Sequence, residues 1–147
     1  MRINTYTDYS LRVLIHAAAK HPTRTTIQEV ADAFAISKNH LMKVINELAR
    51  AGYLETQRGR SGGFTLAKPA NRIKVGEVVR FAEQDSVLVE CFDPLNNRCA
   101  ITPACHLKFH LHEALEAFYA VLDRYTVADL YDQREAVLRH LGLLAAR

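Results

Sequence analysis

Cysteine is absent from most of this 147-residue sequence, because all three cysteines lie between residues 91 and 105. No stretch reaches the roughly 18 consecutive apolar residues that a membrane-spanning helix needs. Polar residues are spread through the first 20 positions, which excludes a secretory signal peptide. We therefore expect a cytoplasmic protein without a membrane partner. Thiols stay reduced in that compartment, so a structural disulfide is a poor explanation for the cysteines.

Proline and glycine are also few, with four and six copies that do not form a low-complexity segment. Hydrophobic residues make up 49% of the chain, which is ample for a packed core. The length fits one domain, or one small domain with an appendage.

Acidic residues are scarce in the first part of the chain. Residues 1–80 carry 13 Lys and Arg against six Asp and Glu, whereas residues 81–147 carry six against ten. The net charge of +3 therefore conceals a basic front and an acidic back. This asymmetry predicts that one end of the molecule meets a polyanion.

The first part of the sequence has the pattern of three helices. Apolar residues recur at helical spacing over residues 5–20, and Pro22 ends that helix. Thr26 stands three residues before Glu29, which is the capping-box arrangement for a short second helix. Ser37 is a suitable N-cap for a third helix.

A tight turn around residues 35 and 36 separates the second and third helices, and Gly52 ends the third. This order of elements predicts a helix-turn-helix. Residues 53–57 and 64–68 then alternate with period two around the segment "RGRSGG", which predicts a β-hairpin. The fold class we expect is mainly α with a small β-hairpin wing, that is, a winged helix-turn-helix.

The rest of the chain predicts a loop over residues 69–72, a short helix over 74–84 and an irregular cysteine stretch. A long helix then runs from residue 103 or 104 to about Tyr125. Its apolar residues form a narrow stripe typical of a helix that pairs with a copy of itself, although packing against the protein's own core is the alternative. The stripe comprises Leu107, Leu111, Leu115, Phe118, Leu122 and Tyr125.

Two short helical segments, over residues 126–133 and 134–144, complete the chain. We divide the sequence into a winged helix-turn-helix domain (1–80), a loop region with the three cysteines (81–105) and a part with the dimerisation helix and C-terminal helices (106–147).

The start of the third helix and the tip of the hairpin carry the candidate DNA-binding residues. Side chains at the start of a recognition helix face base edges in the major groove, where Asn pairs with adenine and Lys with guanine or phosphate. A glycine-bearing wing tip approaches the minor groove or its phosphates. The predicted contacts to double-stranded DNA are Lys38, Asn39, His40, Lys43, Arg58, Gly59, Arg60 and Ser61.

The cysteines are spaced C-x7-C-x5-C, without the paired Cys-x2-Cys of most zinc fingers. Such loose spacing suits an iron–sulfur cluster, which thiolates normally ligate, and three thiolates leave one ligand to come from a non-cysteine residue. Zinc, a thiol-only redox sensor and three buried small side chains are the alternatives. No acid, oxyanion glycine or phosphate loop accompanies Cys105, so we expect no enzyme.

Several segments resemble the iron–sulfur winged-helix regulators that include NsrR, IscR and RirA. These are "TDYSLR", "SKNHLMKVINELARAGY", "RGRSGGFTLAKP", "GEVVR", "ITPACHLK" and "YTVADL". The NsrR branch is the most similar, through "NHLMKVINEL", "ITPAC" and "YTVADL". Lys108 stands where the IscR branch has a histidine. The cysteine spacing also occurs in RirA-like iron sensors.

The resemblance implies a homodimeric transcriptional repressor with a [4Fe-4S] cluster, which nitric oxide attacks so that the protein releases its operator. A [2Fe-2S] cluster in the same loop stays open. Cys91, Cys99 and Cys105 match the thiolate ligands, and Asp8 matches the aspartate that NsrR proteins offer to the cluster of the partner subunit. The competing interpretations are an iron-status or redox sensor of the RirA or IscR type and a zinc-structured DNA-binding module.

Overall fold

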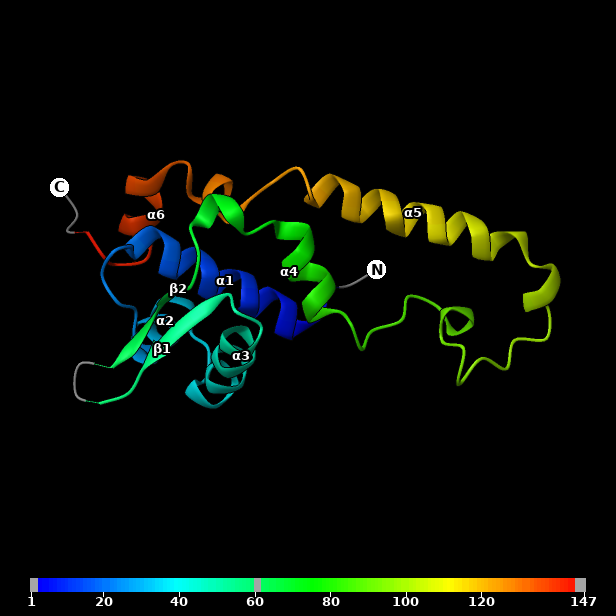
Figure 1. The fold of residues 1–147 in the computed structure, drawn as a ribbon, viewed down its shortest axis with the longest axis horizontal. Helices are drawn as coiled ribbons and strands as arrows, with labels where there is room; N and C mark the ends of the chain where they lie inside the picture. The colour runs from blue at the N-terminus through cyan, green and yellow to red at the C-terminus, as the bar shows by residue number, and fades with distance from the viewer. Residues whose placement is uncertain (1–2, 60–61, 145–147) are drawn as a thin grey trace.

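The computed structural model describes residues 3–59 and 62–144 (Figure 1). In this part of the chain a two-stranded antiparallel hairpin accompanies a mainly helical architecture, as the sequence predicts. The helices are α1 (Thr5–Lys20), α2 (Ile27–Phe34), α3 (Lys38–Arg50), α4 (Val75–Ala82), α5 (His106–Leu122) and α6 (Arg134–His140). The strands are β1 (Leu54–Gln57) and β2 (Gly63–Leu66), and short 3₁₀ turns are η1 (Ala70–Arg72), η2 (Glu90–Phe92), η3 (Thr102–Ala104) and η4 (Val127–Tyr131).

The caps predicted for α2 and α3 are present. Thr26 and Glu29 form the reciprocal capping box of α2. Ser37 Oγ accepts the N–H of His40 at the start of α3. Between the two helices Ala35 is left-handed, with φ of 53°, which turns the chain sharply. Local sequence therefore fixes the helix-turn-helix.

The hairpin has a third participant that the sequence pattern does not reveal. Its register pairs Leu54 with Leu66. Thr25, in the loop between α1 and α2, exchanges two backbone hydrogen bonds with Phe64, at 2.9 and 2.8 Å. A Cβ on Gly63 would lie 2.6 Å from the Thr25 carbonyl oxygen, so this close approach requires glycine. The α1–α2 loop thus holds β2 against the helices.

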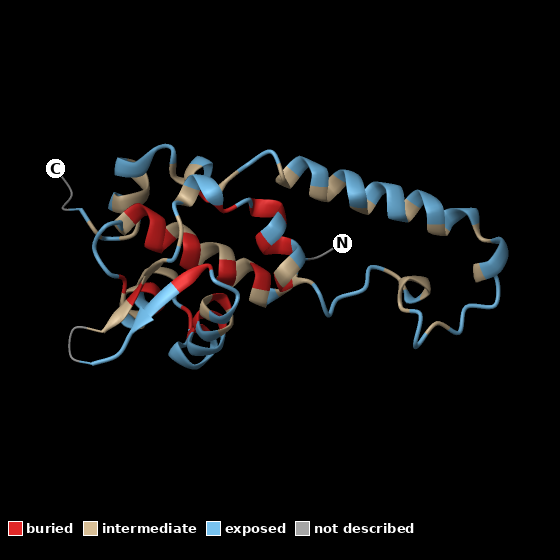
Figure 2. Ribbon diagram, in the orientation of Figure 1, coloured by how far each residue is buried: buried red, intermediate tan, exposed pale blue. Residues whose placement is uncertain are grey.

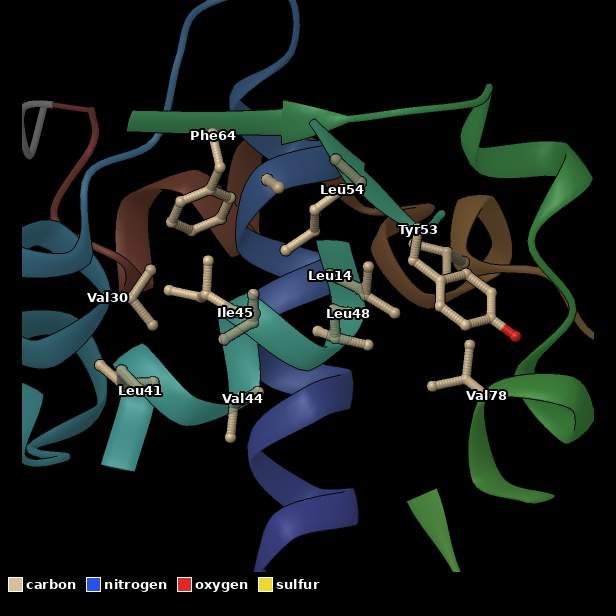
Figure 3. Close-up of a cluster of buried hydrophobic side chains, with 14 of the residues drawn as sticks. Leu14, Val30, Leu41, Val44, Ile45, Leu48, Tyr53, Leu54, Phe64 and Val78 are labelled. Carbon is tan, nitrogen blue, oxygen red and sulfur yellow. The ribbon is translucent and has the colours of Figure 1, made fainter. Parts of the chain in front are cut away.

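The core lies where α1 to α4 meet the hairpin, and we call this part of the molecule the head. Figure 3 shows Phe64 and Leu54 of the hairpin pointing toward α3 and α1. Leu14, Leu41 and Leu48 are fully buried there. Each such side chain contributes about 1.5–3 kcal/mol by leaving water. Figure 2 shows the buried residues concentrated in the head.

The helix α5 projects away from the head as an arm (Figure 1), and none of its residues is buried. The stripe residues Leu111 and Phe118 are half-buried, whereas Leu107 is 61% exposed. The arm contacts the head through α4. Within the described residues, the protein's own core therefore covers the stripe only in part.

The predicted bounds of α5 were wrong at both ends. η3 occupies the predicted first turn and the following residue, Cys105, is extended, so the helix begins at His106. At the other end the Val75 N–H donates to the Tyr125 carbonyl at 2.9 Å. The Val127 N–H donates to the Ile73 carbonyl at 2.8 Å. These contacts draw the chain back to the head before the helix reaches Tyr125.

The loop predicted over residues 69–72 contains η1. None of the helices within residues 3–59 and 62–144 has the length and apolar character that crossing a membrane requires.

Candidate functional site

The start of α3 presents one exposed polar face. Lys38, Asn39, His40 and Lys43 are all exposed, as the sequence predicts for a recognition helix. The opposite face of α3 is buried in the head through Leu41, Val44, Ile45 and Leu48. The helix is therefore oriented with its polar side outward and cannot turn without exposing its apolar residues.

Two further residues extend this face and were missed at the sequence level. Met42 is 45% exposed and Asn46 is exposed. Both follow Lys38 at steps of four residues, which places the three side chains along one side of the helix. That spacing is the signal that could have identified them. Asn pairs with adenine and an apolar side chain contacts the thymine methyl group.

The hairpin stands beside this face and leaves a hollow of about 350 Å³ between them. Asn46, Gln57 and Arg58 line it. Arg58 and Gly59 are exposed near the hairpin tip, and Gly59 has φ of 108°, a conformation that favours glycine. The other two predicted wing residues, Arg60 and Ser61, lie outside the described residues.

Helix α3 also contacts the first turns of α1. The rings of Tyr9 and His40 have centroids 6.3 Å apart. A hollow of about 380 Å³ beside them is lined by Tyr6, Asn39 and Lys43. The residue preceding Tyr9 is Asp8, the candidate non-cysteine ligand. Asp8 is therefore the sequence neighbour of a residue that contacts His40, one of the candidate DNA-binding residues.

Asp8 lies in the first turn of α1 and is paired with its own helix. Its carboxylate accepts from Arg12 Nε at 3.0 Å and from Nη2 at 2.8 Å. The Asp8 side chain is 46% exposed, so it is accessible to a second molecule.

The N-terminus of α1 is fastened to the end of α4 by Glu83. One carboxylate oxygen of Glu83 accepts the Asn4 N–H at 2.9 Å and also the Thr7 hydroxyl. The segment of residues 84–105, which we call the cysteine loop, begins directly after Glu83. The helix that carries Asp8 and the loop that carries the cysteines therefore start from the same contact.

The three cysteines are free thiols within the cysteine loop. Cys91 lies in η2 and Cys105 directly precedes α5, both half-buried, whereas Cys99 is exposed. The Thr102 N–H donates to the Cys99 carbonyl at 3.2 Å, and the Cys105 N–H donates to the Thr102 carbonyl at 3.4 Å. Figure 1 shows the loop running from the end of α4 to the end of α5 farthest from the hairpin.

Further contacts brace this loop. The Glu90 carboxylate accepts the Arg98 N–H, which brings together the neighbours of Cys91 and Cys99. The ring of Phe92 packs edge-on against His112 of α5, with centroids 6.0 Å apart. The loop is thereby tied across itself and to the arm.

The described residues contain no group of three or more His, Cys, Asp or Glu side chains close enough to hold a metal ion. The thiols and Asp8 are therefore not brought together as a finished ligand set in one chain. In their chemistry the donors fit, because free, accessible thiols suit a thiolate-bound metal group. Three histidines that follow Cys105 in the sequence are also exposed, namely His106, His110 and His112.

A comparison with family profiles settles the class of protein. The profile of Rrf2, described as iron-dependent transcriptional regulators, matches residues 3–133. This chain belongs to the Rrf2 family. The resemblance found in the sequence is confirmed, and this Rrf2 protein is a regulator rather than an enzyme.

Similar relatives carry the name HTH-type transcriptional regulator NsrR. The protein of that name from Bacillus subtilis (strain 168) is 51% identical over 144 residues, which cover 97% of this chain and 99% of the relative. The one from Geobacillus kaustophilus (strain HTA426) is 51% identical over 142 residues, 96% of each chain. The Rrf2 protein described here is thus of the NsrR type over nearly its whole length.

Solved structures show the same fold. Staphylococcus aureus CymR in its oxidized form matches with a TM-score of 0.69 and 27% identity, over 88% of this chain and 95% of CymR. The structure titled T. potens IscR matches with a TM-score of 0.70 over 100% of this chain and 94% of that one, at 22% identity. The predicted winged-helix fold is confirmed.

Proposed function

We propose that this Rrf2 protein is a homodimeric repressor that holds an iron–sulfur cluster in its cysteine loop and releases double-stranded operator DNA when nitric oxide reacts with the cluster. The observation that carries the proposal is the shared anchor at Glu83. The cysteine loop and the helix of Asp8 both start there, and that helix contacts the recognition helix through Tyr9 and His40. Such a regulator works in the cytoplasm, where its operator is.

The donors assigned to the cluster are Cys91, Cys99 and Cys105 of one subunit and Asp8 of the other. A [4Fe-4S] cluster is the form we propose, with [2Fe-2S] as the alternative. When bound, it supplies an iron whose carboxylate ligand is displaced more readily than a thiolate. The protein's part is to hold that carboxylate on α1, where Arg12 offers it a second partner at 2.8 Å.

The dimer is proposed to form through the stripe on α5. Within α5, Leu107 of that stripe is 61% exposed, and Leu111, Leu115, Phe118 and Leu122 are only half-buried. An apolar stripe that one chain covers only in part is typical of a helix that pairs with another helix. Pairing along the arm also brings the cysteine loop of one subunit toward the other subunit.

The coupling to DNA follows from the two-fold geometry. Two recognition helices must lie roughly 34 Å apart to enter successive major grooves. A change at Asp8 moves α1, and the ring contact between Tyr9 and His40 transmits that movement to α3. Since many phosphate contacts share the binding energy, a small misfit lowers the affinity strongly.

The decisive experiment is anaerobic purification of the full-length protein, with iron and sulfide analysis. Nitric oxide is then titrated while binding is followed on a duplex that the wild-type protein selects from a random-sequence pool. We expect brown protein with iron and sulfide, and loss of DNA binding as nitric oxide is added. Colourless protein that contains zinc would instead support a zinc-structured module. Release on iron depletion, with no response to nitric oxide, would support an iron sensor of the RirA type.

The role of Asp8 is tested in the same assay. The Asp8→Ala variant should lose DNA binding or its response to nitric oxide, while Asp132→Ala, which removes an exposed carboxylate outside the proposed site, should behave like wild type. An Asp8→Ala protein that holds the cluster and responds normally contradicts the proposed coupling.

A further inference from the structure

The C-terminal helix α6 is joined to the end of α1 by its first residue, Arg134. Arg134 Nε donates to the Ala19 carbonyl at 3.1 Å and Nη2 donates to the His21 carbonyl at 2.9 Å. The last carbonyls of a helix have no partners within it, and a cation at that end also complements the helix dipole. Arg134 therefore acts as a cap that comes from the far end of the sequence.

The carbonyl of Ala19 depends on this contact. Ala19 is fully buried. Within the described backbone no other group donates to it, because Pro22 has no N–H and the Thr23 N–H donates to Lys20 at 3.0 Å. A buried carbonyl without a partner is unfavourable. The end of α1 is consequently held in place by the guanidinium.

The segment that follows leads directly to the wing. Only residues 22–24 separate His21 from Thr25, which is bonded in both directions to Phe64 of β2 at 2.9 and 2.8 Å. The Thr25 carbonyl also lies against Gly63, where a Cβ would be only 2.6 Å away. A shift of the α1 end is therefore passed to β2, because so short a segment with two fixed ends cannot absorb it.

We propose that Arg134 is a positioning residue for the wing, which sets the position of β2 and of Arg58 by fixing the end of α1. The proposal rests on the wing contact with DNA proposed above. In Figure 1, α6 lies on the other side of α1 from α3 and the hairpin, so Arg134 acts at a distance from the DNA.

The test measures the affinity of the anaerobically purified protein for the selected duplex, in a double-mutant cycle. Arg134→Ala should weaken binding about three- to tenfold, the net scale of one ordinary hydrogen bond. Arg58→Ala should also weaken it. Because Arg134 acts through the wing, adding Arg134→Ala to Arg58→Ala should cause little further loss. When Arg134→Ala is combined with Lys38→Ala, in the recognition helix, the fold-losses of affinity caused by the two substitutions should multiply.

Two variants separate positioning from general damage. Arg134→Lys retains a cationic donor and should restore most of the affinity. Arg139→Ala removes an arginine of the same helix whose side chain hydrogen-bonds and pairs only with Glu135 among the described residues, and it should bind like wild type. If Arg134→Ala fails to fold, Arg134→Gln, which retains donors without the charge, replaces it in the cycle.

The outcomes distinguish the two proposals. Unchanged binding by Arg58→Ala contradicts the wing assignment itself. Weakened binding by Arg58→Ala, with Arg134→Ala either harmless or multiplying its effect, overturns only the role of Arg134. Non-additivity with Arg58 together with additivity with Lys38 supports it.

Discussion

At the scale of single residues, His16 combines complete burial with a titratable ring. Its Nδ1 is 3.4 Å from the Thr25 hydroxyl, its Nε2 has no partner among the described residues, and the ring meets Phe34 edge-on. Burial lowers the pKa of His16 below its ordinary value of 6.5, which outweighs the opposing effect of Glu29. Lys20 lowers it further.

We predict that acid destabilises the head through this residue. Below pH 6.5 the unfolded chain takes up a proton that folded His16 refuses, so stability falls as the pH drops from 6.5 toward the lower pKa of the folded state. Thermal melts at pH 7.5 and pH 5.5 should show a lower melting temperature at pH 5.5. The difference should be smaller in His16→Gln, whose side chain does not titrate. An equal acid sensitivity in both proteins would exclude His16 as its source.

Lys43 and Asn46 occupy the same exposed face, but replacing each with Ala should affect DNA binding in a different way. Lys43→Ala removes a charge, so we expect weaker binding to all DNA sequences and a salt dependence reduced by about one unit of slope. Asn46→Ala should cost about 1–3 kcal/mol on the preferred duplex and relax the choice of base at one position. Binding titrations at several salt concentrations, with single-base variants of the duplex, measure both. A uniform loss for Asn46→Ala would contradict base reading.

At the scale of the elements, the joint between head and arm is held by Arg80, Asp123 and Gly76. Arg80 Nη1 and Nη2 donate to the two carboxylate oxygens of Asp123 at 2.8 and 2.6 Å, and its guanidinium lies 4.6 Å from the centre of the Tyr119 ring. This pairing lowers the pKa of Asp123. Gly76 of α4 faces the same carboxylate, and a Cβ there would lie 2.0 Å from Asp123 Oδ1.

We predict that Gly76→Ala lowers the melting temperature by about 5 °C, the scale of an overpacked contact in a chain of this size. The added methyl group forces the Asp123 side chain out of its position. In an Asp123→Ala background the same Gly76 substitution should cost much less, because the clashing carboxylate is gone. Equal losses in the two backgrounds would place the origin of the effect elsewhere. Calorimetry of the four proteins decides between these outcomes.

The elements that local sequence encodes were predictable, and those set by distant contacts were not. The caps at Thr26 and Ser37 fixed the starts of α2 and α3. The end of α5 depends on the backbone hydrogen bond between Val75 and Tyr125, 50 residues apart in the chain, and on the one between Val127 and Ile73. The pairing of Thr25 with Phe64 is equally invisible to any pattern within one segment.

The candidate site divides in the same way. Exposure of Lys38, Asn39, His40 and Lys43 follows from helical spacing alone. The cap that Arg134 provides, the anchor at Glu83 and the relation of Asp8 to the cysteines depend on tertiary or intersubunit geometry. Periodicity within one segment carries no information about them.

At the scale of the whole molecule, the partly exposed stripe of α5 predicts dimerisation. Leu111→Arg places a charge within the stripe and should give a monomer in sedimentation experiments. Losing the second DNA-binding head should weaken binding about a hundredfold or more, since the two half-sites no longer add their affinities. Glu113→Lys, which changes an exposed residue off the stripe, should remain dimeric. A dimeric Leu111→Arg protein would disprove the assignment of the stripe.

No side chain from Glu83 to Thr126 is buried in the described chain. Apart from Glu83 and Asp123, which contact α1 and α4, substitutions in these 44 residues therefore scarcely disturb the packing of the DNA-binding head. Selection can consequently revise the proposed sensing segment while the DNA-binding head stays folded. Under the proposed function, a lineage that inherits this architecture can exchange one chemical stimulus for another, and a foreign sensing segment can be engineered between the same two endpoints.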